Sequence, residues 1–222
     1  MLPWETLDTA SIPGGDTLRL IRRGGEYAIM LGNAPLMNSR LSGSEKALAT
    51  LVAARLRAEA PRLLIGGLGM GFTLRAALES FGAKARIEVD ELVPAIIAWA
   101  RGPMADLFAG CLDDPRVTLR AMDVGASIRA ARSRYDAILL DVDNGPDGLT
   151  REGNDALYSL AGLKAAHAAL ATGGVLAVWS AAPDRDFPKR LERAGFAVEE
   201  ARVKAHLGRS GARHVIWLAA AR

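Results

Sequence analysis

The sequence predicts one mostly parallel α/β sheet with helices on both faces, preceded by a short β-hairpin. From residue 62 onward, β-prone apolar runs alternate with helical patterns, as in successive βαβ units. The run Tyr135–Leu140 is apolar at almost every position, which is typical of a central parallel strand. The last two runs, 196–203 and 214–220, leave no room for a crossover helix and therefore pair antiparallel.

The elements follow in order. Residues 18–21 and 26–31 flank Arg22-Arg23-Gly24-Gly25, which predicts the hairpin. Residues 44–60 show apolar positions at helical spacing, and Pro61 ends that helix. Further strands are expected at 63–65, 86–89, 117–121, 135–140 and 174–180, and further helices at 71–81, 91–101, 126–132, 154–171 and 187–194. We expect residues 1–42 to form the hairpin segment and residues 43–222 the α/β domain.

Composition limits the classes of function. A chain of 222 residues that is 50% hydrophobic can bury one substantial core. The charge is +3 and the Arg residues are scattered, which argues against nucleic acid as a partner. The single cysteine, Cys111, excludes an internal disulfide framework and fits a reducing cytoplasm. The start lacks a signal-peptide pattern, and the charge-free stretch 165–183 divides into a helix end and a strand. We therefore expect a cytoplasmic protein without a membrane span.

A glycine run, Gly66-Gly-Leu-Gly-Met-Gly71, separates the first parallel strand from its helix. In a doubly wound sheet this turn lies at the crevice outside the carboxyl ends of the strands, where ligands bind. Glycine lets a ligand approach the backbone closely, and the helix N-terminus offers free N–H groups. A purely structural tight turn remains the alternative.

Acidic residues end the next two expected strands. Glu88 lies about twenty residues beyond the glycine run, where a carboxylate can accept hydrogen bonds from both ribose hydroxyls of a nucleoside. Asp90 is interpreted as a helix N-cap. Asp123 ends the third strand and could accept from an adenine amino group, or could simply be the polar end of a strand. A dinucleotide dehydrogenase would share the glycine run and the first acid.

The whole order, from glycine loop through two acids and an acidic fourth strand to an antiparallel final pair, resembles the class I S-adenosylmethionine-binding fold of methyltransferases. Within that fold three stretches resemble the spermidine synthase-like aminopropyltransferases. They are Arg86-Ile-Glu-Val-Asp-Glu-Leu-Val-Pro94, Asp114-Pro-Arg-Val-Thr-Leu-Arg-Ala-Met-Asp123 and Tyr135-Asp-Ala-Ile-Leu-Leu-Asp141. The resemblance implies that Glu88 binds the ribose, Asp123 binds the adenine and Asp141 is the catalytic base.

The same resemblance implies a donor site, S-adenosylmethionine or its decarboxylated form as co-substrate, and a small-molecule amine as acceptor. The donor-binding residues would be Gly66, Gly67, Leu68, Gly69, Gly71, Glu88, Val89, Asp123 and Val124. The chemistry has its own logic, because only a neutral amine can attack the carbon on a sulfonium, and a carboxylate must take the proton. Asp143 would hold a cationic acceptor, and Trp179 could line the pocket.

Departures from the family pattern leave alternatives open. Gly69 stands where the family has the acid that binds the donor's free amine, and the loop after Asp141 is shortened. Glu45 alone remains of a Tyr-(His/Gln)-Glu motif and is interpreted as an acid that favours the helix dipole. A small-molecule methyltransferase and a non-catalytic nucleoside-binding homodimer therefore remain as alternatives. No His/Cys/acid spacing indicates a metal site.

Overall fold

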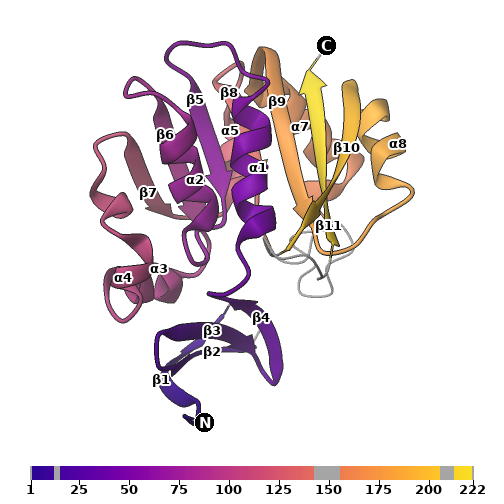
Figure 1. Ribbon diagram of the computed structural model, residues 1–222. Coiled ribbons are helices and arrows are strands. Elements are labelled where there is room, and N and C mark those ends of the chain that lie inside the picture. Colours follow the sequence, from indigo (N-terminus) through magenta and orange to yellow (C-terminus); the bar gives the residue numbers. More distant parts are fainter. Residues whose placement is uncertain (1, 13–15, 143–155, 206–212, 222) are drawn as a thin grey trace.

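The computed structural model describes residues 2–12, 16–142, 156–205 and 213–221, and it contains two sheets (Figure 1). The first is a four-stranded antiparallel sheet in the order β1-β2-β3-β4. Its strands are β1 (Glu5–Ser11), β2 (Thr17–Arg23), β3 (Glu26–Leu31) and β4 (Ala34–Asn38). The expected hairpin is confirmed as β2 and β3. The flanking strands β1 and β4 were not expected, because β1 (ETLDTAS) is mostly polar and β4 (APLMN) is short and contains Pro35.

The second sheet has seven strands in the order β10-β11-β9-β8-β5-β6-β7. Its strands are β5 (Arg62–Gly66), β6 (Arg86–Glu91), β7 (Val117–Ala121), β8 (Tyr135–Leu140), β9 (Leu170–Ser180), β10 (Phe196–Lys204) and β11 (Arg213–Ala221). Strands β7, β6, β5, β8 and β9 pair parallel, and β11 pairs antiparallel with both β9 and β10. The predicted α/β fold class is confirmed.

Helices cover both faces of this sheet, each over its own apolar core (Figure 1). They are α1 (Gly43–Ala53), α2 (Phe72–Ser80), α3 (Pro94–Arg101), α4 (Ala105–Phe108), α5 (Val124–Ala130), α7 (Leu160–Ala169) and α8 (Phe187–Arg193). Helices α1, α2 and α3 pack on one face with Leu63 and Ile65, and α5, α7 and α8 pack on the other with Leu64. In the described part of the chain, no helix is both long enough and apolar enough to span a bilayer.

The four-stranded sheet lies at the carboxyl ends of the parallel strands, where β5 and β9 point towards it (Figure 1). Its buried residues Leu20 and Ile29 belong to the same core as the helices α1 to α3. The indole N–H of Trp99 in α3 donates to Asp8 Oδ2 in β1 at 2.6 Å. The N-terminal sheet is therefore anchored over the edge where ligands bind in such folds.

Several element boundaries differ from those expected; strand β9, for example, begins at Leu170 rather than at residue 174. Helix α1 ends at Ala53 rather than near residue 60. Strand β6 continues to Glu91, two residues beyond the expected end, because Asp90 and Glu91 still pair with Arg120 and Ala121 of β7. The difference in β6 changes which acid stands at the end of the strand.

The Asp114-Pro-Arg motif has a structural role here. Both carboxylate oxygens of Asp114 accept hydrogen bonds from the Arg116 guanidinium, at 2.9 and 2.8 Å. The same guanidinium donates to the carbonyls of Leu78 and Phe81, at 3.1 and 2.8 Å. Because the last carbonyls of a helix have no partner within it, Arg116 caps α2 and joins it to the start of β7.

Candidate active site

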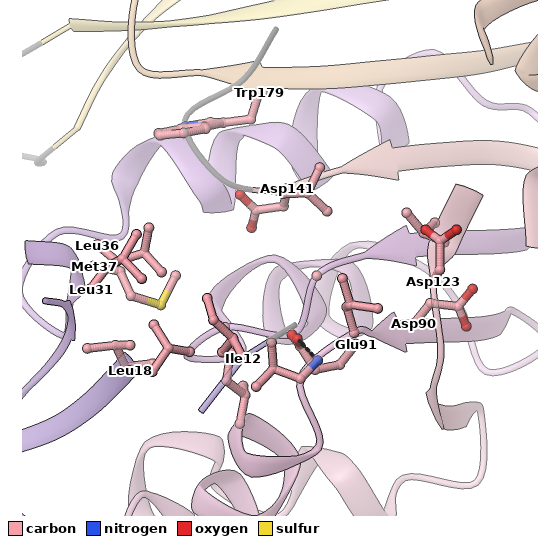
Figure 2. Close-up of a pocket in the computed structure, with 18 of the residues that line it drawn as sticks. Ile12, Leu18, Leu31, Leu36, Met37, Asp90, Glu91, Asp123, Asp141 and Trp179 are labelled. Atoms are coloured by element: carbon pink, nitrogen blue, oxygen red, sulfur yellow. Dashed lines mark hydrogen bonds between the residues drawn. The ribbon is translucent and has the colours of Figure 1, made fainter. Parts of the chain in front are cut away.

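A cavity of about 150 Å³ lies between the carboxyl ends of the parallel strands and the N-terminal sheet (Figure 2). Its lining comes from both sheets and from the loops after β5, β6, β7 and β8. The lining residues are Ile12, Leu18, Ile29, Leu31, Leu36, Met37, Glu45, Gly67, Gly69, Asp90, Glu91, Leu92, Val93, Ile96, Met122, Asp123, Val124, Asp141, Val142 and Trp179.

Asp141 follows β8 directly and contacts the glycine loop. Its backbone N–H donates to the carbonyl of Gly66 at 2.9 Å, which extends the β5–β8 ladder by one bond. Gly67 has a φ of +89°, and a Cβ built there would lie 2.3 Å from the carbonyl oxygen of Asp141. Only glycine fits that position. The structure thus brings together the two features that the sequence singled out, the glycine loop and the acid after the fourth strand.

The carboxyl group of Asp141 is held in an environment that favours its protonated form. Loss of hydration, with the negative charge of Glu45 second, raises its pKa to about 7. The buried Thr73 hydroxyl opposes this shift by donating to Asp141 Oδ2 at 2.6 Å. A carboxyl group with a pKa near neutrality can exchange a proton readily at pH 7, which suits a general base.

Glu45 lines the same cavity. Its role therefore goes beyond the favourable interaction with the helix dipole that the sequence predicts. Burial is the main cause that raises the pKa of Glu45. The Ser44 hydroxyl donates to Glu45 Oε2 at 2.7 Å and lies 2.8 Å from Nδ1 of His214 on β11. When Glu45 is ionised, the single Ser44 proton is donated to it, and the Ser44 oxygen can then accept from Nδ1–H of His214. The surviving Glu of the family motif was the available sequence signal for this position.

We expect opposite shifts of the pH–rate profile from two substitutions around Asp141. Glu45→Gln removes a negative charge, lowers the pKa of Asp141 and moves the rising limb of the profile to lower pH. Thr73→Val removes the hydrogen bond to the carboxylate, raises that pKa and moves the limb to higher pH. Turnover measured between pH 5 and 9 checks both variants. Shifts in the same direction would contradict this account of the site.

At the end of β6, Asp90 and Glu91 occupy the place that the sequence assigned to Glu88. Glu88 does not line the cavity. Burial opposes its ionisation, but hydrogen bonds from Arg134 and Tyr135 and the charge of Arg120 hold its pKa below the usual value. Asp90, two residues further along β6, lies beside Asp123 and lines the cavity, whereas Glu88 does not, so the ribose role of Glu88 stays a prediction (Figure 2).

The carboxylates of Asp90 and Glu91 have different surroundings. Glu91 accepts from the backbone N–H groups of Leu68 and Val93, at 2.9 and 2.8 Å, and so ties the glycine loop to β6. Asp90 Oδ1 accepts from Arg120 Nε at 2.7 Å. Asp90 Oδ2 is buried and has no hydrogen-bond partner among the described residues. A buried oxygen of this kind on a cavity wall can accept from a ligand hydroxyl.

Asp123 and Val124 both line the cavity, as expected. Both oxygens of Asp123 also cap helix α5, because they accept from the N–H groups of Gly125 and Ala126 at 2.8 and 3.1 Å. Oδ2 also accepts from the Arg129 guanidinium at 3.2 Å, whereas Oδ1 keeps a second lone pair with which Asp123 can accept from a ligand amino group.

Some of the remaining predicted site residues line the cavity, and others pack in the core behind it. Gly69 and Trp179 line the cavity, with the Trp179 ring edge-on to His214 at a centroid distance of 4.9 Å. Besides Glu88, four expected donor-binding residues do not line it: Gly66, Leu68, Gly71 and Val89. Val89 is fully buried in the core. Gly71 allows close packing, since a Cβ there would lie 2.5 Å from the Phe108 ring. Asp143 lies outside the described residues.

Comparison with known proteins gives relatives of one kind. The chain is 33% identical over 146 residues to polyamine aminopropyltransferase 1 of Streptomyces coelicolor. This alignment covers 62% of this chain and 27% of that protein. It is 35% identical over 131 residues to polyamine aminopropyltransferase 2 of Pseudomonas aeruginosa, and this alignment covers 56% of this chain and 35% of that protein. The chain is therefore similar in sequence to polyamine aminopropyltransferases over somewhat more than half of its length. The alignments span only about a quarter to a third of these curated relatives, and no family model matches the chain.

Solved structures of spermidine synthases have the same fold as this chain. Spermidine synthase from Thermotoga maritima superposes with a TM-score of 0.75 at 16% identity, over 97% of this chain and 72% of that one. A spermidine synthase in complex with the transition state analogue AdoDATO gives 0.74 at 17% identity, with the same coverage. TrmN from Thermus thermophilus gives 0.57 at 22% identity, over 80% of this chain and 48% of that one. At these identities the likeness concerns the fold, the N-terminal sheet included.

Proposed function

We propose that this chain transfers an aminopropyl or related alkyl group from a sulfonium nucleoside to a small-molecule amine, with Asp141 as the base. The observation that carries the proposal is a carboxyl group with a pKa of about 7, placed against the glycine loop in a cavity whose far end holds Asp90 and Asp123. The polyamine aminopropyltransferases among its relatives support the same reaction class.

The reaction makes one bond and breaks one. The lone pair of a neutral amine attacks the carbon attached to the sulfonium, so that an N–C bond forms. The C–S bond breaks, and sulfur keeps the electron pair as a neutral thioether. The proton lost by the amine passes to the Asp141 carboxylate. An alkylamine has a pKa near 10, so it is mostly protonated at pH 7, and a carboxylate of raised pKa helps to provide the neutral form.

The donor nucleoside would lie across the glycine loop. Asp90, with its unpartnered Oδ2, would accept from the ribose hydroxyls, and Asp123 from the adenine amino group. Glu91 would act indirectly, because it fixes the N–H groups of Leu68 and Val93. The analogue complex of the related fold supports a donor of the decarboxylated S-adenosylmethionine type. We also propose the cytoplasm as its location, and we retain the homodimer as a proposal.

Calorimetric titration of three nucleosides tests this function. S-adenosylmethionine, its decarboxylated form and methylthioadenosine are each added to the protein. The proposal predicts binding of methylthioadenosine and of the decarboxylated donor. A clear preference for the intact donor would replace aminopropyl transfer by methyl transfer, and binding of none of the three would exclude both reactions. Asp90→Asn serves as the variant expected to weaken all three ligands alike.

A further inference from the structure

The cavity has two chemically different ends, with Asp141 between them (Figure 2). One end carries the acids Asp90 and Asp123. The other end is formed by aliphatic side chains of the N-terminal sheet and of Ile12, which directly follows β1, and together we call them the apolar chamber. Its residues are Ile12, Leu18, Ile29, Leu31, Leu36 and Met37.

The side chain of Met37 packs against Gly69 of the glycine loop. A Cβ built on Gly69 would lie 2.7 Å from the terminal methyl carbon of Met37 and 3.1 Å from its sulfur. The family resemblance puts the acid that holds a donor amine at this position. In this chain a thioether from β4 packs against a bare glycine instead, so the apolar chamber extends to the glycine loop.

The apolar chamber is a built surface and not a loose patch. Leu18 and Ile29 are 2% and 0% exposed, on the paired strands β2 and β3. Burying a methylene group on such a wall is favourable by about 0.8 kcal/mol, which is about fourfold in affinity, whereas an ammonium group there would lose its hydration. Glu45, Asp90, Glu91, Asp123 and Asp141 are the carboxylates that line the cavity among the described residues, and both oxygens of Glu91 already accept from backbone N–H groups. Glu45 and Asp141, whose charges interact, can together hold one protonated amine at the reacting end.

We propose that the acceptor is an amphipathic monoamine, whose nitrogen lies at Asp141 and Glu45 and whose hydrocarbon body fills the apolar chamber. The inference rests on the proposed amine-alkylating function and names its substrate class. A linear polyamine fits poorly, because its second ammonium group would lie among Leu18, Ile29 and Met37.

Direct binding of matched amines tests the proposal without requiring turnover. n-Hexylamine and cadaverine have equal numbers of non-hydrogen atoms and differ in one end group, methyl or ammonium. Each is titrated calorimetrically into the full chain, with and without saturating methylthioadenosine. We expect hexylamine to bind at least about tenfold more tightly than cadaverine, and about 15-fold more tightly than n-butylamine, at about fourfold per methylene. Equal or tighter binding of cadaverine, no dependence on chain length, or binding of neither amine would overturn the proposal.

A pair of variants locates the binding in the chamber. Leu36→Glu adds an acid to the partly exposed wall of the chamber, and Leu41→Glu adds the same charge nearby at a residue that is 39% exposed and does not line the cavity. We expect Leu36→Glu to weaken hexylamine about tenfold and to strengthen cadaverine, and Leu41→Glu to change neither. If hexylamine binds as expected but is never alkylated, the proposed reaction fails and the chamber assignment stands.

Discussion

Asp141→Asn is expected to lower the turnover number about 1,000-fold while donor affinity stays within about threefold, since a positioned general base contributes roughly 10²–10⁴. The amide keeps the size of the side chain and can still contact the Thr73 hydroxyl, but it cannot take a proton from the amine. Single-turnover kinetics and nucleoside titration measure the two quantities separately. Loss of donor affinity, or unfolding, would mean that Asp141 is structural.

Asp141→Asn is also expected to change how the free energy of unfolding depends on pH. Because the folded state raises the pKa of Asp141 to about 7, the native protein binds more protons than the unfolded chain between about pH 4 and 7. This carboxyl group therefore makes the free energy of unfolding fall as pH rises through that window. Asn does not titrate, so Asp141→Asn should remove this part of the decline, and urea unfolding at several pH values measures it.

Arg120→Leu is expected to lower the free energy of unfolding by about 3 kcal/mol, the cost of leaving a buried charge without its partner. Arg120 contacts Asp90 at 2.7 Å and Glu88 at 2.9 Å, and the Asp90 side chain is fully buried. Glu88 keeps Arg134 and Tyr135 as partners, so the loss concerns Asp90. Urea denaturation of the purified variant measures the change.

Two comparisons control that measurement. Arg129→Leu breaks an ion pair with Asp123 whose side chains are 59% and 50% exposed, and it should cost less than about 1 kcal/mol. Adding Asp90→Asn to Arg120→Leu removes the unpaired charge and should restore part of the stability. An equal loss in the two Arg variants, or no rescue by Asp90→Asn, would contradict the assigned role of Arg120.

The strand pattern of the sequence was sufficient to predict the sheet and the place of Asp141. The apolar run Tyr135–Leu140 has the bounds of β8, and the glycine run follows β5 and contacts Asp141. Strand ends were less certain, because polar residues can continue a strand when its neighbour pairs with them. Asp90 is such a residue: its partner Arg120 comes from β7, and nothing local to β6 indicates it.

Contacts between residues that are far apart in the sequence could not be predicted from the sequence pattern. Glu45 influences Asp141 because α1 and the end of β8 meet in the fold, and Ser44 contacts His214 from the last strand. Met37 lies on β4, a strand that the sequence did not predict, and its contact with Gly69 depends on where the N-terminal sheet sits. The apolar character of the chamber could therefore be recognised only from the structure.

Mass spectrometry of the amine after incubation with decarboxylated S-adenosylmethionine tests the central claim most directly. We predict that n-hexylamine gains one aminopropyl group, with one equivalent of methylthioadenosine released, and that Asp141→Asn forms neither product at a comparable rate. No aminopropylated amine with any acceptor, while the donor binds, would contradict the account, as would formation of the product at an undiminished rate by Asp141→Asn.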